Sequence, residues 1–191
     1  TAAQAHLIAD ATTWTVDFVV GISDSATNLL NNDIISTDLA HATGSNAGEG
    51  DDGLNIEVAS GTVSVTQLNA IKGATSGTIT AAISASAEDL AGLDTGAGDA
   101  ITATVTGTSA TAARLNTING KTNVAVVATG VQAITGDASD VITLLTAHKA
   151  DPSQITIDED YTVTVSGDVT VDEANTIVLD TAGTADFTGK I

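Results

Sequence analysis

The sequence predicts a β-rich fold, in which repeated strand-plus-short-helix units form a solenoid-like stack. Residues 68–75, 115–122 and, more weakly, 174–181 resemble one another. Strand-like runs recur with a constant spacing of 23 residues, and short helical patterns lie between them. Self-similarity at a fixed period is typical of chains that stack small supersecondary units on one another. These observations predict the architecture of the protein, but they identify no substrate or reaction.

The strand-like runs are rich in Val, Ile and Thr, which favour strands. They cover residues 78–83, 101–106 and 124–128. We expect these three strands to lie side by side in one sheet. The alternative fold is a β-sandwich with helical insertions, whose strands would pair antiparallel across hairpins.

Two short helices are expected at residues 86–93 and 111–118. Ser86 can cap the first of them, and Glu88 and Asp89 would face the positive end of its dipole. Each helix carries two apolar residues three positions apart, which gives one narrow apolar edge. Isolated helices shorter than about 12 residues are marginal in water, so each unit must bury this edge on its neighbour.

The first 60 residues do not follow the repeat, so we divide the chain into an N-terminal segment, 1–60, and a repeat region, 61–191. A loop rich in glycine and aspartate, residues 44–53, marks the end of the N-terminal segment.

The N-terminal segment also contains a strand-like stretch, residues 12–22, that we treat as a candidate docking strand. Its alternate residues form one apolar face: Trp14, Val16, Phe18, Val20 and Ile22. This face fits either a core strand of its own domain or a strand offered to a neighbouring subunit. Both interpretations remain open from the sequence.

Past residue 128 the spacing loosens. We expect a helix at 137–149, strands at 155–157 and 161–165, a hairpin that returns through 169–171, and a last strand within 182–191. The hairpin is inferred from the alternation on both sides of a Ser-Gly-Asp turn.

The composition excludes several classes of function. The 24 acidic and 5 basic residues give a net charge of −19, which opposes binding to nucleic acid or to an anionic membrane. We interpret the acidity as a solvated surface, with a saline habitat or bound divalent cations as alternatives. Without cysteine the chain has no disulfide, zinc–thiolate site or thiol nucleophile. No apolar run approaches the roughly 18 residues of a membrane span, so we expect no membrane insertion.

The chain begins at Thr1 without a methionine. Removal of a secretory signal is the usual reason for such a start, so we expect a secreted or cell-surface protein.

Residues 48–54 match most of the glycine-rich nonapeptide that binds calcium between stacked copies. Asp52, with Asp51 beside it, would supply the carboxylate ligands. The alternative is an acidic loop without a ligand. We therefore expect no cofactor, with calcium as the one candidate ion.

No set of residues in the sequence identifies a reaction. His6, His41 and His148 are scattered and lack the spacing of a metal site or a catalytic triad. Asp158 and Asp160 are spaced as a pair, but such pairs arise by chance among 24 acidic residues. We expect neither a catalytic nor a metal role for these residues, and we expect the protein not to be an enzyme.

Residues 66–80 and 110–118 resemble the Thr/Ala/Gly-rich repeats of large exported proteins of cyanobacteria and other aquatic bacteria. The resemblance covers roughly residues 60–130 and is weaker from there to the end of the chain. The resemblance implies a surface, adhesin or extracellular-fibre module, and it assigns no functional residues.

The sequence therefore predicts a non-enzymatic structural subunit of an extracellular filament or surface assembly. We expect a homo-oligomer or polymer, with subunits joined by addition of the candidate docking strand to a neighbour's sheet. The alternative is a calcium-dependent adhesin or ligand-binding module.

Overall fold

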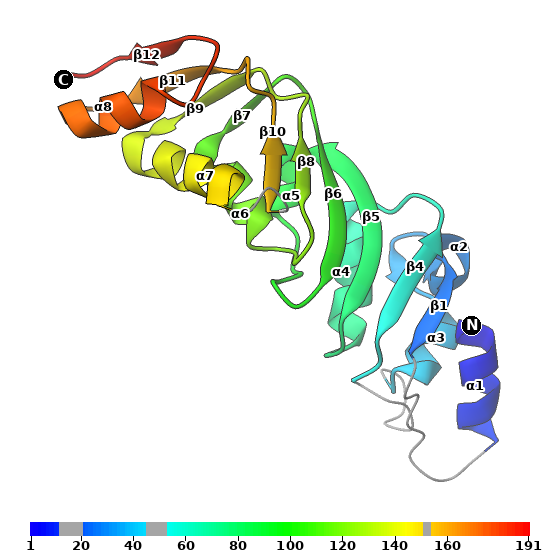
Figure 1. Cartoon of the computed structure of the whole chain (residues 1–191). Helices are drawn as coiled ribbons and strands as arrows, with labels where there is room; N and C mark the ends of the chain where they lie inside the picture. Colours follow the sequence, from blue (N-terminus) through cyan, green and yellow to red (C-terminus); the bar gives the residue numbers. More distant parts are fainter. Residues whose placement is uncertain (12–20, 45–52, 151–153) are drawn as a thin grey trace. The chain divides into compact units, whose positions relative to one another are not determined.

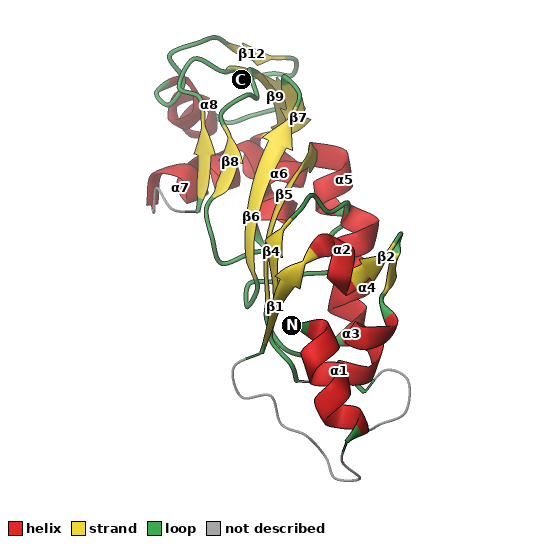
Figure 2. Ribbon diagram, turned by 90° about the vertical axis from the view of Figure 1, so that its right-hand side faces the viewer, coloured by secondary structure: helices red, strands yellow, loops and turns green. Residues whose placement is uncertain are grey.

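The computed structural model describes residues 1–11, 21–44, 53–150 and 154–191. These residues form a mixed α/β fold with eight helices and with strands that pair mainly in parallel (Figure 1). Figure 2 shows how much of the chain is helical, so the expectation of a β-rich fold was too narrow. The parallel pairing also contradicts the antiparallel sandwich alternative.

The chain divides into two compact units. The first comprises residues 1–83 and 93–101, and the second comprises residues 84–92 and 102–191. The boundaries between the two units therefore fall at residues 83/84, 92/93 and 101/102.

Parallel strands form the centre of the first unit. They are β1 (Ile22–Ser25), β4 (Ile56–Ser60) and β5 (Ile79–Ser86), the last of which belongs to this unit as far as residue 83. The register places Ile22 opposite Ile56 and Ile56 opposite Ile79. These three side chains are at most 4% exposed, so one column of isoleucines runs across the strands.

Four helices and a small hairpin complete the first unit. They are α1 (Ala2–Asp10), α2 (Ala26–Leu29), the antiparallel pair β2 (Leu30–Asn31) and β3 (Ile34–Ile35), α3 (Thr37–Ala42) and α4 (Val65–Ala74). The first repeat copy lies in α4, which begins with a capping box between Ser64 and Gln67. Leu68 and Ile71 of α4 are fully buried, as the repeat predicts.

A buried carboxylate ties residues 93–101 to the first unit. The Asp99 side chain is 4% exposed and accepts hydrogen bonds from Lys72 Nζ at 3.2 Å and from the Ile79 N–H at 2.8 Å. It also accepts the Gly96 N–H at 2.9 Å. A buried charge needs such partners, because an unpaired one is costly.

The second unit contains two sets of parallel strands. One set is β6 (Ala100–Thr106), which belongs to this unit from residue 102, β8 (Val126–Ala128) and β10 (Ile155–Ile157). The other has the order β12-β11-β9-β7, with β7 (Ser109–Thr111), β9 (Ala133–Asp137), β11 (Thr162–Ser166) and β12 (Ala185–Phe187). Three successive segments therefore each give one strand to each set and then one helix.

The helices of the second unit pack in chain order, α5 on α6, α6 on α7 and α7 on α8. They are α5 (Ala87–Ala91), α6 (Ala112–Asn119), α7 (Ala138–Ala150) and α8 (Val171–Val178). The second repeat copy lies in α6 and the third in α8. Leu115 and Ile118 of α6 and Ile177 of α8 are fully buried, so each copy supplies the apolar edge of its segment.

The predicted elements are largely confirmed. The strands expected at 78–83, 101–106 and 124–128 correspond to β5, β6 and β8, and β6 pairs in parallel with β8. The helix expected at 137–149 is α7, and Asp137 caps it by accepting the Asp140 N–H at 2.8 Å.

The hairpin expected at 161–171 was wrong. Strand β11 pairs in parallel with β9 and β12, and Val171 begins helix α8. Thr170 and Glu173 form a capping box that starts this helix. The alternation of valine and threonine before residue 171 belongs to a strand end followed by a helix cap.

The same turn follows helices α4 and α8 and leads into the next strand. The Thr75 hydroxyl donates to the Leu54 carbonyl at 2.5 Å and accepts the Gly77 N–H at 3.0 Å. Thr181 does the same with the Tyr161 carbonyl and the Gly183 N–H. The side chain of each threonine therefore links its own turn to the backbone of the preceding segment.

We expect Thr75→Val to lower the free energy of unfolding by about 1–3 kcal/mol, because it leaves a buried carbonyl and an amide without their partner. Valine keeps the shape of threonine, so packing is nearly preserved. Urea denaturation followed by circular dichroism measures the change.

Thr80→Val is the matched control, since Thr80 is exposed on β5. It should change the stability by no more than about 0.5 kcal/mol. Equal effects of the two substitutions would contradict a special role for the turn threonine.

Candidate functional site

Two histidines and two aspartates lie together in the first unit, and we call them the His–Asp cluster: His6, Asp10, Asp38 and His41. Within the part of the chain that the structure describes, His6, Asp10 and His41 are the group whose ligand atoms lie close enough to hold a metal ion together, all within 4.8 Å of one another. The cluster is formed by two helices that are distant in sequence, α1 and α3.

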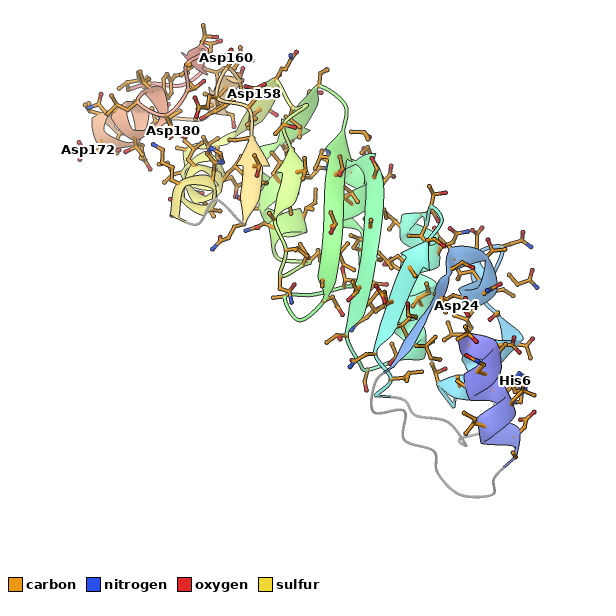
Figure 3. All side chains as sticks on the ribbon, turned by 45° about the vertical axis from the view of Figure 1, so that its right-hand side comes forward. His6, Asp24, Asp158, Asp160, Asp172 and Asp180 are labelled. Carbon is orange, nitrogen blue, oxygen red and sulfur yellow. The ribbon has the colours of Figure 1, made fainter. Side chains whose placement is uncertain are left out.

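Helix geometry explains how the cluster forms. His6 and Asp10 are four residues apart on α1, and Asp38 and His41 are three residues apart on α3. Residues at these spacings share one face of a helix. The two helices pack against each other, which brings the two faces together. Figure 3 shows His6 on α1 in the first unit.

The side chains of the cluster are in direct contact. His6 Nδ1 lies 2.5 Å from Asp38 Oδ1, and His6 Nε2 lies 3.0 Å from Asp10 Oδ2. The other oxygen of Asp10 lies 3.4 Å from His41 Nδ1. The two imidazole rings are stacked, with centroids 4.2 Å apart and an angle of 22° between their planes. Asp10 thus bridges the two histidines.

The cluster is open to solvent and its charge depends on pH. The His6 side chain is 21% exposed and that of Asp10 is 51% exposed. The hydrogen bond to Asp38 raises the pKa of His6 above its usual 6.5; burial opposes this rise, and the charge of Asp10 adds to it. A protonated His6 can donate to both carboxylates at once.

Asp24 on β1 positions the start of α1. Its carboxylate is 8% exposed and accepts the Ala2 N–H at 3.0 Å, the Ser25 N–H at 2.9 Å and the Asn28 side-chain amide at 2.7 Å. Burial alone would raise the pKa of Asp24, but these hydrogen bonds outweigh burial and lower it. Figure 3 shows Asp24 on β1. Its hydrogen bond with the Ala2 N–H links α1 to the strands of the first unit.

A second polar site lies in the second unit, where a pocket of about 400 Å³ is lined by residues of α7 and of the loops that follow β10 and α8. Buried Tyr161 donates its hydroxyl hydrogen to Asp180 at 3.3 Å, and Asp180 also pairs with Lys149. Burial, followed by the charge of Asp180 and this hydrogen bond, raises the pKa of Tyr161. The tyrosine is therefore held as a neutral donor, and the network satisfies its buried hydroxyl.

Asp158 and Asp160 lie on an exposed turn of the second unit (Figure 3). The Asp160 N–H donates to Asp158 Oδ1 at 3.3 Å. This contact stabilises the turn, and it gives the pair the role of a turn cap.

The structure places one residue of the predicted docking face. Ile22 is buried at the start of β1, and its N–H donates to the Asn55 carbonyl at 2.8 Å. Ile22 is thus part of the core of the first unit. The other predicted site residues lie outside the described residues: Trp14, Val16, Phe18, Val20, Asp51 and Asp52.

The sequence analysis missed the His–Asp cluster. It treated the histidines as scattered, but His6 and His41 are stacked on each other, and only His148 lies apart, with its Nδ1 3.0 Å from the Ile155 carbonyl. The available signal was the pairing of His-x-x-x-Asp on one helix with Asp-x-x-His on another. Nothing in the sequence alone says that these two helices pack together.

Comparison of the chain with protein-family models, with curated proteins and with solved structures found no match. Among the described helices, none is both long enough and apolar enough to cross a bilayer.

We expect the His–Asp cluster to make the stability of the protein depend on pH. Because the pKa of His6 is raised in the folded protein, its contribution is complete below its unfolded value of 6.5 and is lost as the pH rises through the folded value. The melting temperature should therefore fall more for the wild type than for His6→Gln between about pH 5.5 and about pH 8.5.

His148→Gln is the control, because His148 contacts a carbonyl and no carboxylate. Its melting temperature should follow that of the wild type across this pH range. A His6→Gln curve parallel to the wild type would show that the cluster does not couple folding to protonation.

Proposed function

We propose that the chain is a non-enzymatic structural subunit of an extracellular filament or surface assembly. The observation that carries this proposal is the outer end of the second unit, where the described residues include both an edge strand of a sheet and exposed apolar side chains at a neighbouring helix. Exposed strand edges and apolar surfaces of this kind recruit other chains.

The sheet edge is formed by β12, which is the outer strand of the β12-β11-β9-β7 sheet. Next to it in sequence, α8 packs against α7. Val171 and Val178 of α8 are 60% and 51% exposed, and they lie seven residues apart on one side of the helix. Leu179 follows them at 84% exposure. We call Val171, Val178, Leu179 and β12 the outer edge.

A second copy of this chain is the partner that we propose for the outer edge. Each strand-plus-helix segment buries its apolar side on the next, so a further strand and apolar surface would continue the pattern in a solenoid-like stack. In residues 14–20, Trp, Val, Phe and Val alternate with Thr, Asp and a further Val, which gives one wholly apolar face that suits a donor strand. Ile22 is bound to β4, so the donor would comprise residues 14–20 alone.

Repetition supports a structural role independently of the outer edge. The same turn, the same helix caps and the same buried leucine or isoleucine pair recur in both units. The polar network around Tyr161 provides a hydrogen-bond partner for its buried hydroxyl, and this structural role explains the network without a catalytic one. A surface, adhesin or fibre module of an exported protein uses such repetition to build length.

We expect the wild-type protein to self-associate, and Leu179→Asp to weaken the association by at least about tenfold, because a charge would be buried at the interface. Val16→Asp with Phe18→Asp should have a similar effect if residues 14–20 are the donor. Light scattering after size exclusion and negative-stain microscopy measure the assemblies.

Ile34→Asp is the matched control, because Ile34 on β3 is 65% exposed in the first unit and lies away from the outer edge in the chain. It should leave association unchanged. Point substitutions are preferable to removal of residues 1–22, which would also delete α1 and its bond to Asp24. A wild type that stays monomeric at high concentration would overturn the proposal.

A calcium-dependent adhesin or ligand-binding module is the alternative, favoured by the sequence of residues 48–54. If it is correct, millimolar calcium should raise the melting temperature of the wild type and not that of Asp51→Asn with Asp52→Asn. Absence of both binding heat and thermal stabilisation would leave the structural subunit as the better proposal.

A further inference from the structure

We propose that His6, His41 and Asp10 bind a divalent transition-metal ion such as zinc, and that Asp38 is a positioning residue for His6. The donor atoms would be His6 Nε2, His41 Nδ1 and one or both oxygens of Asp10. This site lies in the first unit and is independent of the assembly proposed above.

The spacing of the donor atoms fits a small ion. Zinc binds imidazole nitrogen and carboxylate oxygen at about 2.0–2.2 Å, which places neighbouring ligands of a tetrahedral site roughly 3.3 Å apart. The distances from Asp10 to His6 and to His41 are 3.0 Å and 3.4 Å. All three ligand atoms lie within 4.8 Å of one another, so small side-chain rotations would close the site.

The partly exposed side chains allow these rotations. The two rings are stacked, so His41 must turn its Nδ1 toward the ion that His6 Nε2 faces. The His41 side chain is 31% exposed and that of Asp10 is 51% exposed, which leaves room for both to move. His6 is the more buried ligand, and it is already held by Asp38.

Asp38 fixes the tautomer of His6 that a metal requires. Its carboxylate lies 2.5 Å from His6 Nδ1, so it favours the neutral tautomer that carries its proton on Nδ1 and leaves the lone pair of Nε2 for a metal ion. Histidine ligands of metal sites commonly donate their second N–H to a carboxylate in this way. The cluster thus contains a ligand set and the outer carboxylate that orients it.

Without a metal ion, a proton can occupy the contact between His6 and Asp10. At 3.0 Å, His6 Nε2 and Asp10 Oδ2 attract each other when a proton lies between them. A metal ion would replace this proton, since metal ligands must be deprotonated.

The ligand types select the class of metal. Two imidazoles with one carboxylate suit zinc, copper or nickel, whereas calcium and magnesium prefer oxygen ligands. The net charge of −19 raises the local concentration of any cation. Three protein ligands would leave a fourth position to water. Because the ligands come from α1 and α3, a bound ion would cross-link the two helices.

Calorimetric titration of the tag-free full chain with zinc chloride near neutral pH tests the proposal. We expect one zinc ion per chain, a higher melting temperature with zinc, and visible absorption bands when cobalt is used instead. His6→Gln and His41→Gln should each weaken zinc binding by at least about tenfold, and Asp38→Asn by about 10–100-fold. Asp38→Glu should restore much of the loss, because it keeps a carboxylate near His6.

His148→Gln is the matched control and should bind zinc like the wild type, since His148 lies in the second unit. Circular dichroism of each variant separates loss of ligands from loss of fold, and His41→Gln serves if His6→Gln does not fold. Zinc binding that is weak or absent in the wild type would overturn the proposal. So would binding that survives both ligand substitutions, or that is lost in His148→Gln.

Discussion

The structure depends on a threonine hydroxyl that ties the turn after a helix to the backbone of the preceding segment. Thr75 binds the Leu54 carbonyl in the first unit, and Thr181 binds the Tyr161 carbonyl in the second. Two residues later the chain passes so close to the same carbonyl that a Cβ on Gly77 or Gly183 would lie within 2.5 Å of it. Only glycine fits such an approach. The turn therefore fixes where the next strand starts and makes parallel pairing the natural outcome.

Once the strand starts are fixed, small aliphatic residues are enough to fill the core. The chain has only four aromatic residues, and its core consists mainly of Ile, Leu, Val and Ala. In the first unit Ile22, Ile56 and Ile79 lie in register across three strands, so each isoleucine packs on an equivalent one. In the second unit Leu115 and Ile118 of α6 and Ile177 of α8 are fully buried, like Leu68 and Ile71 of α4 in the first. Because each segment contributes similar residues to the core, the segments have similar sequences. The repeat could therefore be recognised from the sequence alone.

Local signals predicted much of the fold, and long-range packing decided the rest. The strands β5, β6 and β8 followed from short runs rich in Val, Ile and Thr, and the helix α7 followed from its capping residue, Asp137. The hairpin was wrong because Val169 and Val171 alternate like a strand, whereas Thr170 and Glu173 cap a helix, and the capping box is the stronger signal. The balance of helix and strand was misjudged because helices of only five to eight residues look marginal until their neighbours bury them.

The His–Asp cluster could not be predicted in the same way, because it needs α1 to pack on α3. That packing has a consequence for the segment between α1 and β1. Asp10 ends α1, and Ile22 begins β1, so the proposed donor residues 14–20 are joined at both ends to elements of the first unit. A metal ion on Asp10 would hold the first of these ends more firmly, while β4 already holds the second.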